Sequence, residues 1–113
     1  MPIWHKSLRE RFDRLPPHQQ ILLVANELNR TQNLLTQPLE YRNALERALE
    51  LMDFMAADRR WIGKLRELRR AREVTAMYYA ADRPQPTAVL MRCFIQLDSS
   101  AWRYLHGLPK KDR

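Results

Sequence analysis

Arginine side chains are concentrated in one short segment of this chain, where the chemistry they can perform is the binding of anions. Between positions 59 and 72 the sequence holds seven cations and one acid, Glu67, and this window carries six of the seven units of net positive charge. A planar guanidinium group can donate two parallel hydrogen bonds to a phosphate or a carboxylate. A basic protein whose excess charge lies on one segment offers a defined surface to an anionic partner.

Three of these arginines share one side of the helix that the segment is expected to form. Arg59, Arg66 and Arg70 fall within about 40° of each other at 100° per residue, and they span about 16 Å along the axis. We predict that all three are exposed, unpaired with acids and available to the phosphates of a nucleic acid or the carboxylates of an acidic protein. No exposed aromatic side chain is expected beside them, so sequence readout would be weak. A simple solvated helix face is the alternative.

Arg72 differs from its neighbours because it projects from the centre of the apolar stripe of its helix. An arginine that faces a core needs a carboxylate partner, and Asp98 lies within the apolar arc of the last predicted helix. In an antiparallel pair of helices, position 72 faces roughly position 95, within one turn of position 98. The sequence therefore predicts a buried Arg72–Asp98 ion pair that fixes helix register, and a polar pocket for an acidic ligand is the alternative.

Few residue patterns indicate catalysis or metal binding. His5, His18 and His106 lie far apart in the sequence, and no spacing of histidine or cysteine suits zinc. Cys93 is expected to be a buried, unreactive thiol. Because no acid, base and nucleophile converge in the pattern, we expect neither an enzyme nor a bound metal or other cofactor.

Prolines separate the apolar-periodic segments, and these segments are predicted to be helices. The expected fold is all-α, an up-down antiparallel four-helix bundle with an additional short N-terminal helix. Residues 1–15 form the leading helix, residues 17–106 the four-helix core and residues 107–113 a tail, all within one domain of 113 residues. With only two glycines in the chain, strand-turn-strand architectures and glycine-rich phosphate loops are not expected.

A break is predicted before the basic helix, although no glycine or proline separates it from the preceding one. The apolar stripe after Trp61 is rotated by roughly 160° from the stripe before Met55 at 100° per residue. A straight helix would therefore expose one of its two apolar faces. We place a tight turn near residues 57–60, with Asp58 as the N-cap of the next helix.

The last predicted helix, which ends near residue 106, has more apolar surface than one core requires. One of its edges consists of Met91, Ile95 and Trp102, residue types that suit the centre of an interface, and it predicts a homodimer. The alternative is that the leading helix covers this edge through the stripe that begins at Trp4. Phe54 likewise lies on the polar side of its own helix.

Composition limits the remaining function classes. No apolar run approaches the ~20 residues of a membrane span, and residues 1–6 do not resemble a signal peptide. The single cysteine excludes an internal disulfide and fits a reducing cytoplasm. The sequence therefore favours a cytoplasmic, non-enzymatic helical interaction or adaptor module with a basic face for an anionic partner. The alternative is a nucleic-acid-binding accessory protein that contacts phosphates through residues 59–72.

Overall fold

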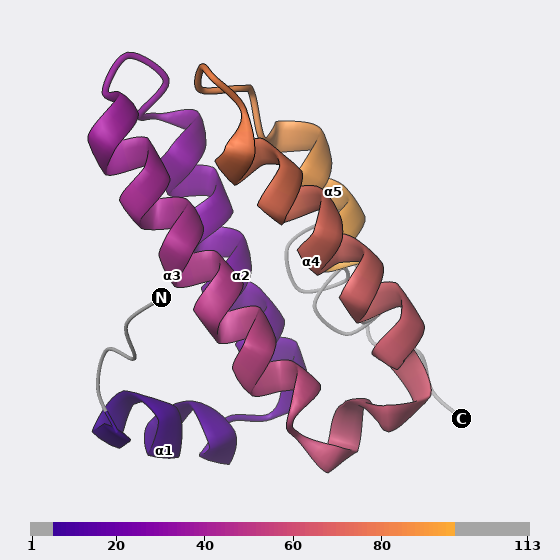
Figure 1. The fold of residues 1–113 in the computed structure, drawn as a ribbon. Helices are drawn as coiled ribbons and strands as arrows, with labels where there is room; N and C mark the ends of the chain where they lie inside the picture. The colour runs from indigo at the N-terminus through magenta and orange to yellow at the C-terminus, as the bar shows by residue number, and fades with distance from the viewer. Residues whose placement is uncertain (1–5, 97–113) are drawn as a thin grey trace, which may run out of the picture.

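The computed structural model describes residues 6–96, and all regular secondary structure within them is helical (Figure 1). The elements are α1 Lys6–Arg14, α2 Pro17–Gln32, α3 Pro38–Ala56, the 3₁₀ helix η1 Arg59–Lys64, α4 Leu65–Ala80 and α5 Ala88–Ile95. Both α2 and α3 begin at a proline, where the missing N–H has no helical partner and the fixed φ suits the first turn. The predicted all-α class is confirmed.

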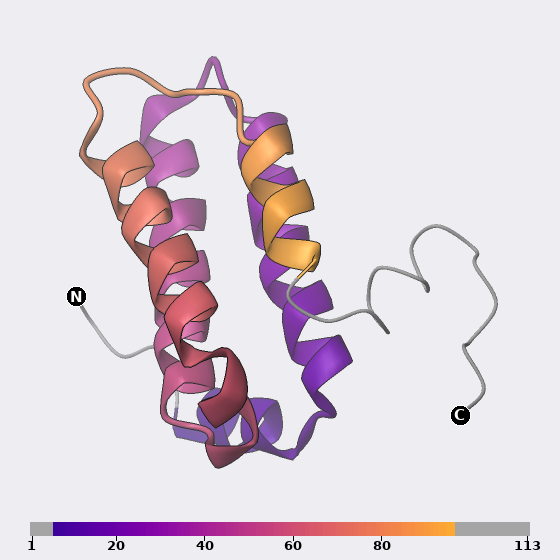
Figure 2. The same cartoon turned by 90° about the vertical axis from the view of Figure 1, so that its right-hand side faces the viewer.

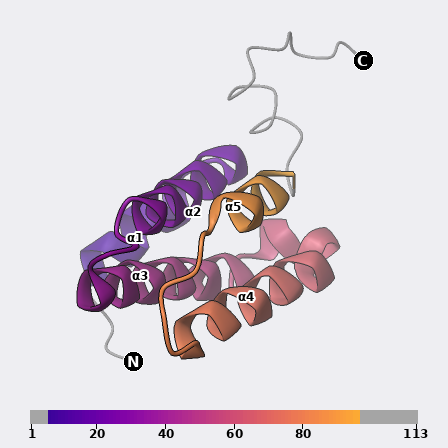
Figure 3. The same cartoon turned by 90° about the horizontal axis from the view of Figure 1, so that it is seen from above.

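The helices after α1 alternate in direction along the chain, and they pack in two layers. Seen from above, α2 and α5 lie in one layer and α3 and α4 in the other (Figure 3). Each of α2 and α4 contacts both α3 and α5. The connection from α4 to α5 crosses between the layers at one end of the molecule (Figure 2). At the opposite end, α1 lies across the bottom and packs against α3 (Figure 1).

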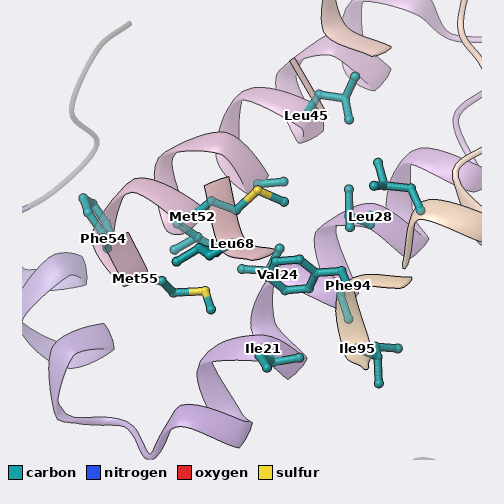
Figure 4. Close-up of a cluster of buried hydrophobic side chains, with 14 of the residues drawn as sticks. Ile21, Val24, Leu28, Leu45, Met52, Phe54, Met55, Leu68, Phe94 and Ile95 are labelled. Carbon is teal, nitrogen blue, oxygen red and sulfur yellow. The ribbon is translucent and has the colours of Figure 1, made fainter. Parts of the chain in front are cut away.

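The core lies between the two layers and uses the apolar stripes that the sequence predicts. Side chains from α2, α3 and α5 point toward one another in this space (Figure 4). The apolar stripe that precedes and includes Met55 is buried along the whole of α3: Tyr41, Ala44, Leu45, Ala48, Leu49, Met52 and Met55. Complete burial of a large apolar side chain contributes about 1.5–3 kcal/mol, so this stripe fixes which side of α3 faces inward.

The predicted break between α3 and the basic segment is confirmed. The α3 helix ends at Ala56, a turn follows, and the Asp58 side chain accepts a hydrogen bond of 2.9 Å from the backbone N–H of Arg60, as an N-cap does. The basic segment then begins as the 3₁₀ helix η1 and becomes α-helical only at Leu65. A 3₁₀ turn is common at a helix N-terminus, and Gly63 within it is a poor α-helix former.

A buried glutamine joins the start of α2 to this break. The Gln20 side chain is fully buried. Its Nε2 donates to the Phe12 carbonyl at 2.9 Å and to Asp58 Oδ2 at 3.2 Å. Its Oε1 accepts a hydrogen bond of 2.6 Å from Nε1 of the buried Trp61. One amide therefore connects the end of α1, the start of α2 and the turn after α3.

Arg60 binds Asp58 from the solvent side of the junction at which α1, α2 and the turn after α3 meet. Its guanidinium donates to both carboxylate oxygens of Asp58, with Nη2 to Oδ2 at 2.6 Å, and Nη2 also donates to the Asp13 carbonyl at 2.8 Å. The side-chain hydrogen bonds from Arg60 are the main reason that the pKa of Asp58 falls to about 2. The ionised Asp58 carboxylate is thus part of the folded structure.

The leading helix covers a second apolar side of α3. The Phe12 ring packs against the Phe54 ring with centroids 6.0 Å apart, and the Arg9 guanidinium lies 5.5 Å from the Phe54 centroid. Phe54, which the wheel places on the polar side of α3, is buried as a result. The sequence left open the alternative that the leading helix covers the last helix. In the described residues α1 packs on α3 instead.

Threonine hydroxyls fix the start of α5 against the end of α2. The buried Thr87 hydroxyl donates to the Leu28 carbonyl at 2.8 Å and lies 2.7 Å from the Thr31 hydroxyl. The backbone N–H of Thr87 donates to Gln32 Oε1 at 2.7 Å. These bonds set the position of α5 relative to α2, and so the position of one wall of the groove described below.

Replacing Gln20 with Ala should destabilise the protein by about 1–3 kcal/mol, because it leaves the buried Trp61 indole N–H without its hydrogen-bond partner. Urea unfolding followed by circular dichroism would measure this loss. The exposed neighbour Gln19 is the matched control, and Gln19→Ala should change stability by no more than about 0.5 kcal/mol. Equal midpoints for the two variants would contradict the role assigned to Gln20.

The Asp58 carboxylate should make stability fall with acid. Its folded pKa of about 2 lies below the ordinary value of 3.8, so its contribution is present above about pH 5 and is lost as the pH falls toward 2. Asp58→Asn keeps a capping side chain but removes the charge, and should cost about 1 kcal/mol at pH 7. As the pH falls from about 5 toward 2, the urea midpoints of the unmodified protein and of Asp58→Asn should converge. A constant difference would show that the charge is irrelevant.

Candidate functional site

Two of the seven cations between positions 59 and 72 are used inside the fold. Arg60 closes the junction with Asp58, and Arg72 binds Asp53 on α3. The other five are exposed, and none of their side chains forms a hydrogen bond or ion pair with a residue in the range 9–96: Arg59, Lys64, Arg66, Arg69 and Arg70. The excess charge of the segment is therefore left on the outside of η1 and α4.

Three of these arginines gather on α4. Arg66, Arg69 and Arg70 line a hollow of about 680 Å³ together with Arg72 and Glu73. Side chains three and four positions apart on a helix are neighbours, about 5–6 Å between Cβ atoms. We call Arg66, Arg69 and Arg70 the basic face.

Arg59 does not belong to this group, although the sequence pattern places it there. Arg59 is exposed as expected but does not line the hollow among the described residues. The expected alignment assumed 100° per residue throughout, whereas the residues of η1 turn by about 120° each and add a rotation of about 100° before α4 begins. Arg69 lines the hollow instead, at the edge of the same side of α4. Helical periodicity alone gave no reason to choose Arg69 over Arg59.

Arg72 forms an ion pair with Asp53, a partner that the sequence pattern did not predict, and it is less buried than predicted. Its Nε donates to Asp53 Oδ1 at 2.6 Å and its Nη2 to Oδ2 at 3.2 Å, which raises the pKa of Arg72. The two side chains are 37% and 48% exposed, so the expected burial is wrong. The inward side of α4 is centred on Leu68 and Thr75, and Arg72 lies at the edge that borders α3. Asp98 lies outside the described residues.

The apolar edge expected to form a homodimer is partly internal. Ile95 is 2% exposed and packs in the core beside Phe94, and Met91 is half-buried against that core. Ile95 is therefore not an interface residue, because α5 turns this side toward α2 and α4. Trp102 lies outside the described residues, so self-association through the last helix stays a prediction.

A groove between α4 and α5 is a site that the sequence pattern does not predict. Its volume is about 440 Å³. Its described lining consists of Glu67, Arg70, Ala71, Val74 and Tyr78 from α4, and Val89, Leu90, Cys93 and Phe94 with Gln96 from α5 and its end. Cys93 is exposed here, so the expected burial of this thiol is wrong. Arg70 belongs both to this groove and to the basic face.

Other polar groups do not assemble into a second site. Burial raises the pKa of Glu27, whose Oε1 has no hydrogen-bond partner among the described residues and lies 3.9 Å from Arg30 Nη1. In residues 6–96 no group of three or more His, Cys, Asp or Glu side chains could hold a metal ion. None of the described helices has the length and apolarity needed to cross a membrane.

Comparison with protein-family models, curated proteins and solved structures finds no match for this chain. Function must therefore be inferred from the basic face and the groove.

The half-exposed Arg72–Asp53 pair should contribute little to stability. Arg72→Ala and Asp53→Ala should each cost no more than about 1 kcal/mol, because solvent screens the pair. Leu68→Ala, one turn away in the core, should cost about 2–5 kcal/mol. A double-mutant cycle by urea unfolding would measure the pair directly. A loss of about 3 kcal/mol or more for Arg72→Ala would indicate a buried charge instead.

Proposed function

We propose that this chain is a non-enzymatic helical interaction module that binds an anionic partner through the basic face. The observation that supports this is the arrangement of Arg66, Arg69 and Arg70 around one hollow, all exposed and without an acidic partner in the described part of the chain. Guanidinium groups in this arrangement suit carboxylate or phosphate oxygens.

The spacing of these arginines includes repulsive pairs. Arg66 is three and four residues from Arg69 and Arg70, and like charges at these spacings destabilise a helix by a few tenths of a kcal/mol per pair. Arg60 and Arg72, by contrast, are each paired with an acid. An anionic partner would relieve the repulsion among the other three.

The architecture and location in this proposal follow the sequence pattern. We infer that residues 1–113 form one domain, an up-down antiparallel four-helix bundle in which α1 is the additional helix. The alternating directions of α2, α3, α4 and α5 support this (Figure 1). The single cysteine supports a cytoplasmic location.

Nucleic acid is the second candidate partner. The one-turn spacing of Arg66 and Arg70 favours it, because both could meet phosphates of one strand. Base stacking has less support: Tyr78 and Tyr79 are half-buried, the Tyr79 hydroxyl donates to Glu46 at 2.7 Å, and the Arg42 guanidinium covers its ring. Binding of this kind would depend strongly on salt and little on sequence.

Replacing Arg66, Arg69 and Arg70 together with Ala should weaken binding to acidic probes. Fluorescence anisotropy with a polyglutamate peptide and a single-stranded RNA of about 20 nucleotides, at 50 and 200 mM salt, would measure this. For RNA the salt slope should fall by about 2, since each of three phosphate contacts contributes ~0.7.

The matched control is Arg11, Arg14 and Arg83 replaced together with Ala. These three arginines are also exposed and lie outside the basic face. Their replacement removes the same amount of positive charge. The control should bind nearly as tightly as the unmodified protein. Equal losses in both triple variants would mean that only net charge matters, and would contradict the basic face as a binding site.

A further inference from the structure

The groove between α4 and α5 has the shape of a helix-binding site. Figure 2 views the side of the molecule on which these two helices run past one another. The groove extends along α4 from Glu67 to Tyr78, which is about 16 Å at ~1.5 Å per residue. Residues at its rim, such as Val89 and Cys93, are exposed, so the groove is open along one side. An amphipathic helix fits this length with anchors at i, i+3, i+4 and i+7.

The floor of the groove is apolar. Ala71, Val74, Leu90 and Phe94 supply it. At its rim Val89 is 61% exposed. A surface with exposed aliphatic side chains is typical of a site for a protein partner. A sugar-phosphate backbone offers no apolar group to cover these residues.

Charge decides which protein partner fits. Arg70 borders the groove, and Arg66 and Arg69 lie beside it on α4. The acids in the described lining are fewer: Glu67 in the groove and Glu73 in the hollow of the basic face. A second copy of this chain would bring an equally basic surface, since the net charge is +7, and like charges oppose such contact. A partner with carboxylates beside its apolar anchors complements both parts of the surface.

We propose that the α4–α5 groove binds an acidic amphipathic helix of another protein. Its apolar side chains lie over Val74 and Leu90, and its flanking carboxylates pair with Arg70 and the rest of the basic face. This inference rests on the proposed function, because it names the partner class of the same anion-binding surface. Apolar burial holds the complex together, and the arginines attract and orient the partner.

Two synthetic peptides of about 18 residues would test this, because they separate charge from shape. Both contain the same glutamates and leucines. In one the leucines follow i, i+3, i+4 and i+7 spacing, and in the other they are spread around the helix. The full chain should bind the amphipathic peptide at least about ten-fold more tightly in anisotropy titrations, because only that peptide places its leucines together in the groove.

Val89→Lys gives the sharpest variant, because it adds a positive charge at the apolar rim. A site that recognised only charge would bind acidic peptides more tightly after this change, whereas groove docking predicts binding weakened by about ten-fold. Leu39→Lys is the matched control. Leu39 is 73% exposed, lies on α3 away from the groove and gains the same charge, so this variant should bind at least as well as the unmodified protein.

The single cysteine offers an independent measurement of the same site. The exposed Cys93 thiol lines the groove, so it should react readily with a thiol reagent in the folded full chain. The amphipathic peptide should slow this reaction, and the spread peptide should slow it less. A thiol that is unreactive without peptide would mean that the chain already covers the groove, and would overturn the proposal.

The outcomes separate this inference from the proposed function. Equal binding of both peptides, with no weakening by Val89→Lys, would overturn groove docking and leave the basic face intact. A single-stranded RNA of about 20 nucleotides that binds more tightly than the amphipathic peptide and displaces it would overturn the choice of a protein partner. Binding of no acidic probe at all, with or without the arginines of the basic face, would overturn the proposed function itself.

Discussion

The hydrogen bonds of one buried side chain, Gln20, determine how the chain turns after α3. Its amide holds the Trp61 indole, the Asp58 carboxylate and the Phe12 carbonyl together, and so joins the ends of three helices at one point. Because the Gln20 amide and the Trp61 indole are both buried, their polar atoms need partners inside the protein, and this arrangement supplies them. The break between α3 and the basic segment is therefore a fixed corner, which directs α4 back along α3.

The position of that corner decides which arginines of the segment pair with acids and which remain exposed. Arg60 binds at the corner itself and Arg72 binds across to α3, so each is held by an acid. Once α4 lies along α3, the turns between these two arginines direct Arg66, Arg69 and Arg70 outward. The same run of sequence thus pairs arginines with acids near its ends and offers anion-binding groups in its middle, as the helical period dictates.

The packing of α5 adds an apolar component to this charged surface. Thr87 fixes the start of α5 against α2, and the space left between α5 and α4 becomes a groove whose lining includes Arg70. Arginines alone would attract many anions with little discrimination, because solvent-exposed charge pairs are weak and screened by salt. A groove of defined length with an apolar floor adds the shape on which selectivity for a partner depends.

The sequence by itself determined the helices, the inward side of α3 and the break with its Asp58 cap, because these depend on local periodicity, prolines and capping chemistry. Tertiary structure decided the rest. Periodicity shows that Arg72 and Ile95 lie near an apolar side, but only the placement of α3, α4 and α5 shows that Arg72 meets Asp53 and that Ile95 is internal. A helix pattern records which side is buried and not which neighbour buries it, so the α4–α5 groove and the exposure of Cys93 arose only from packing.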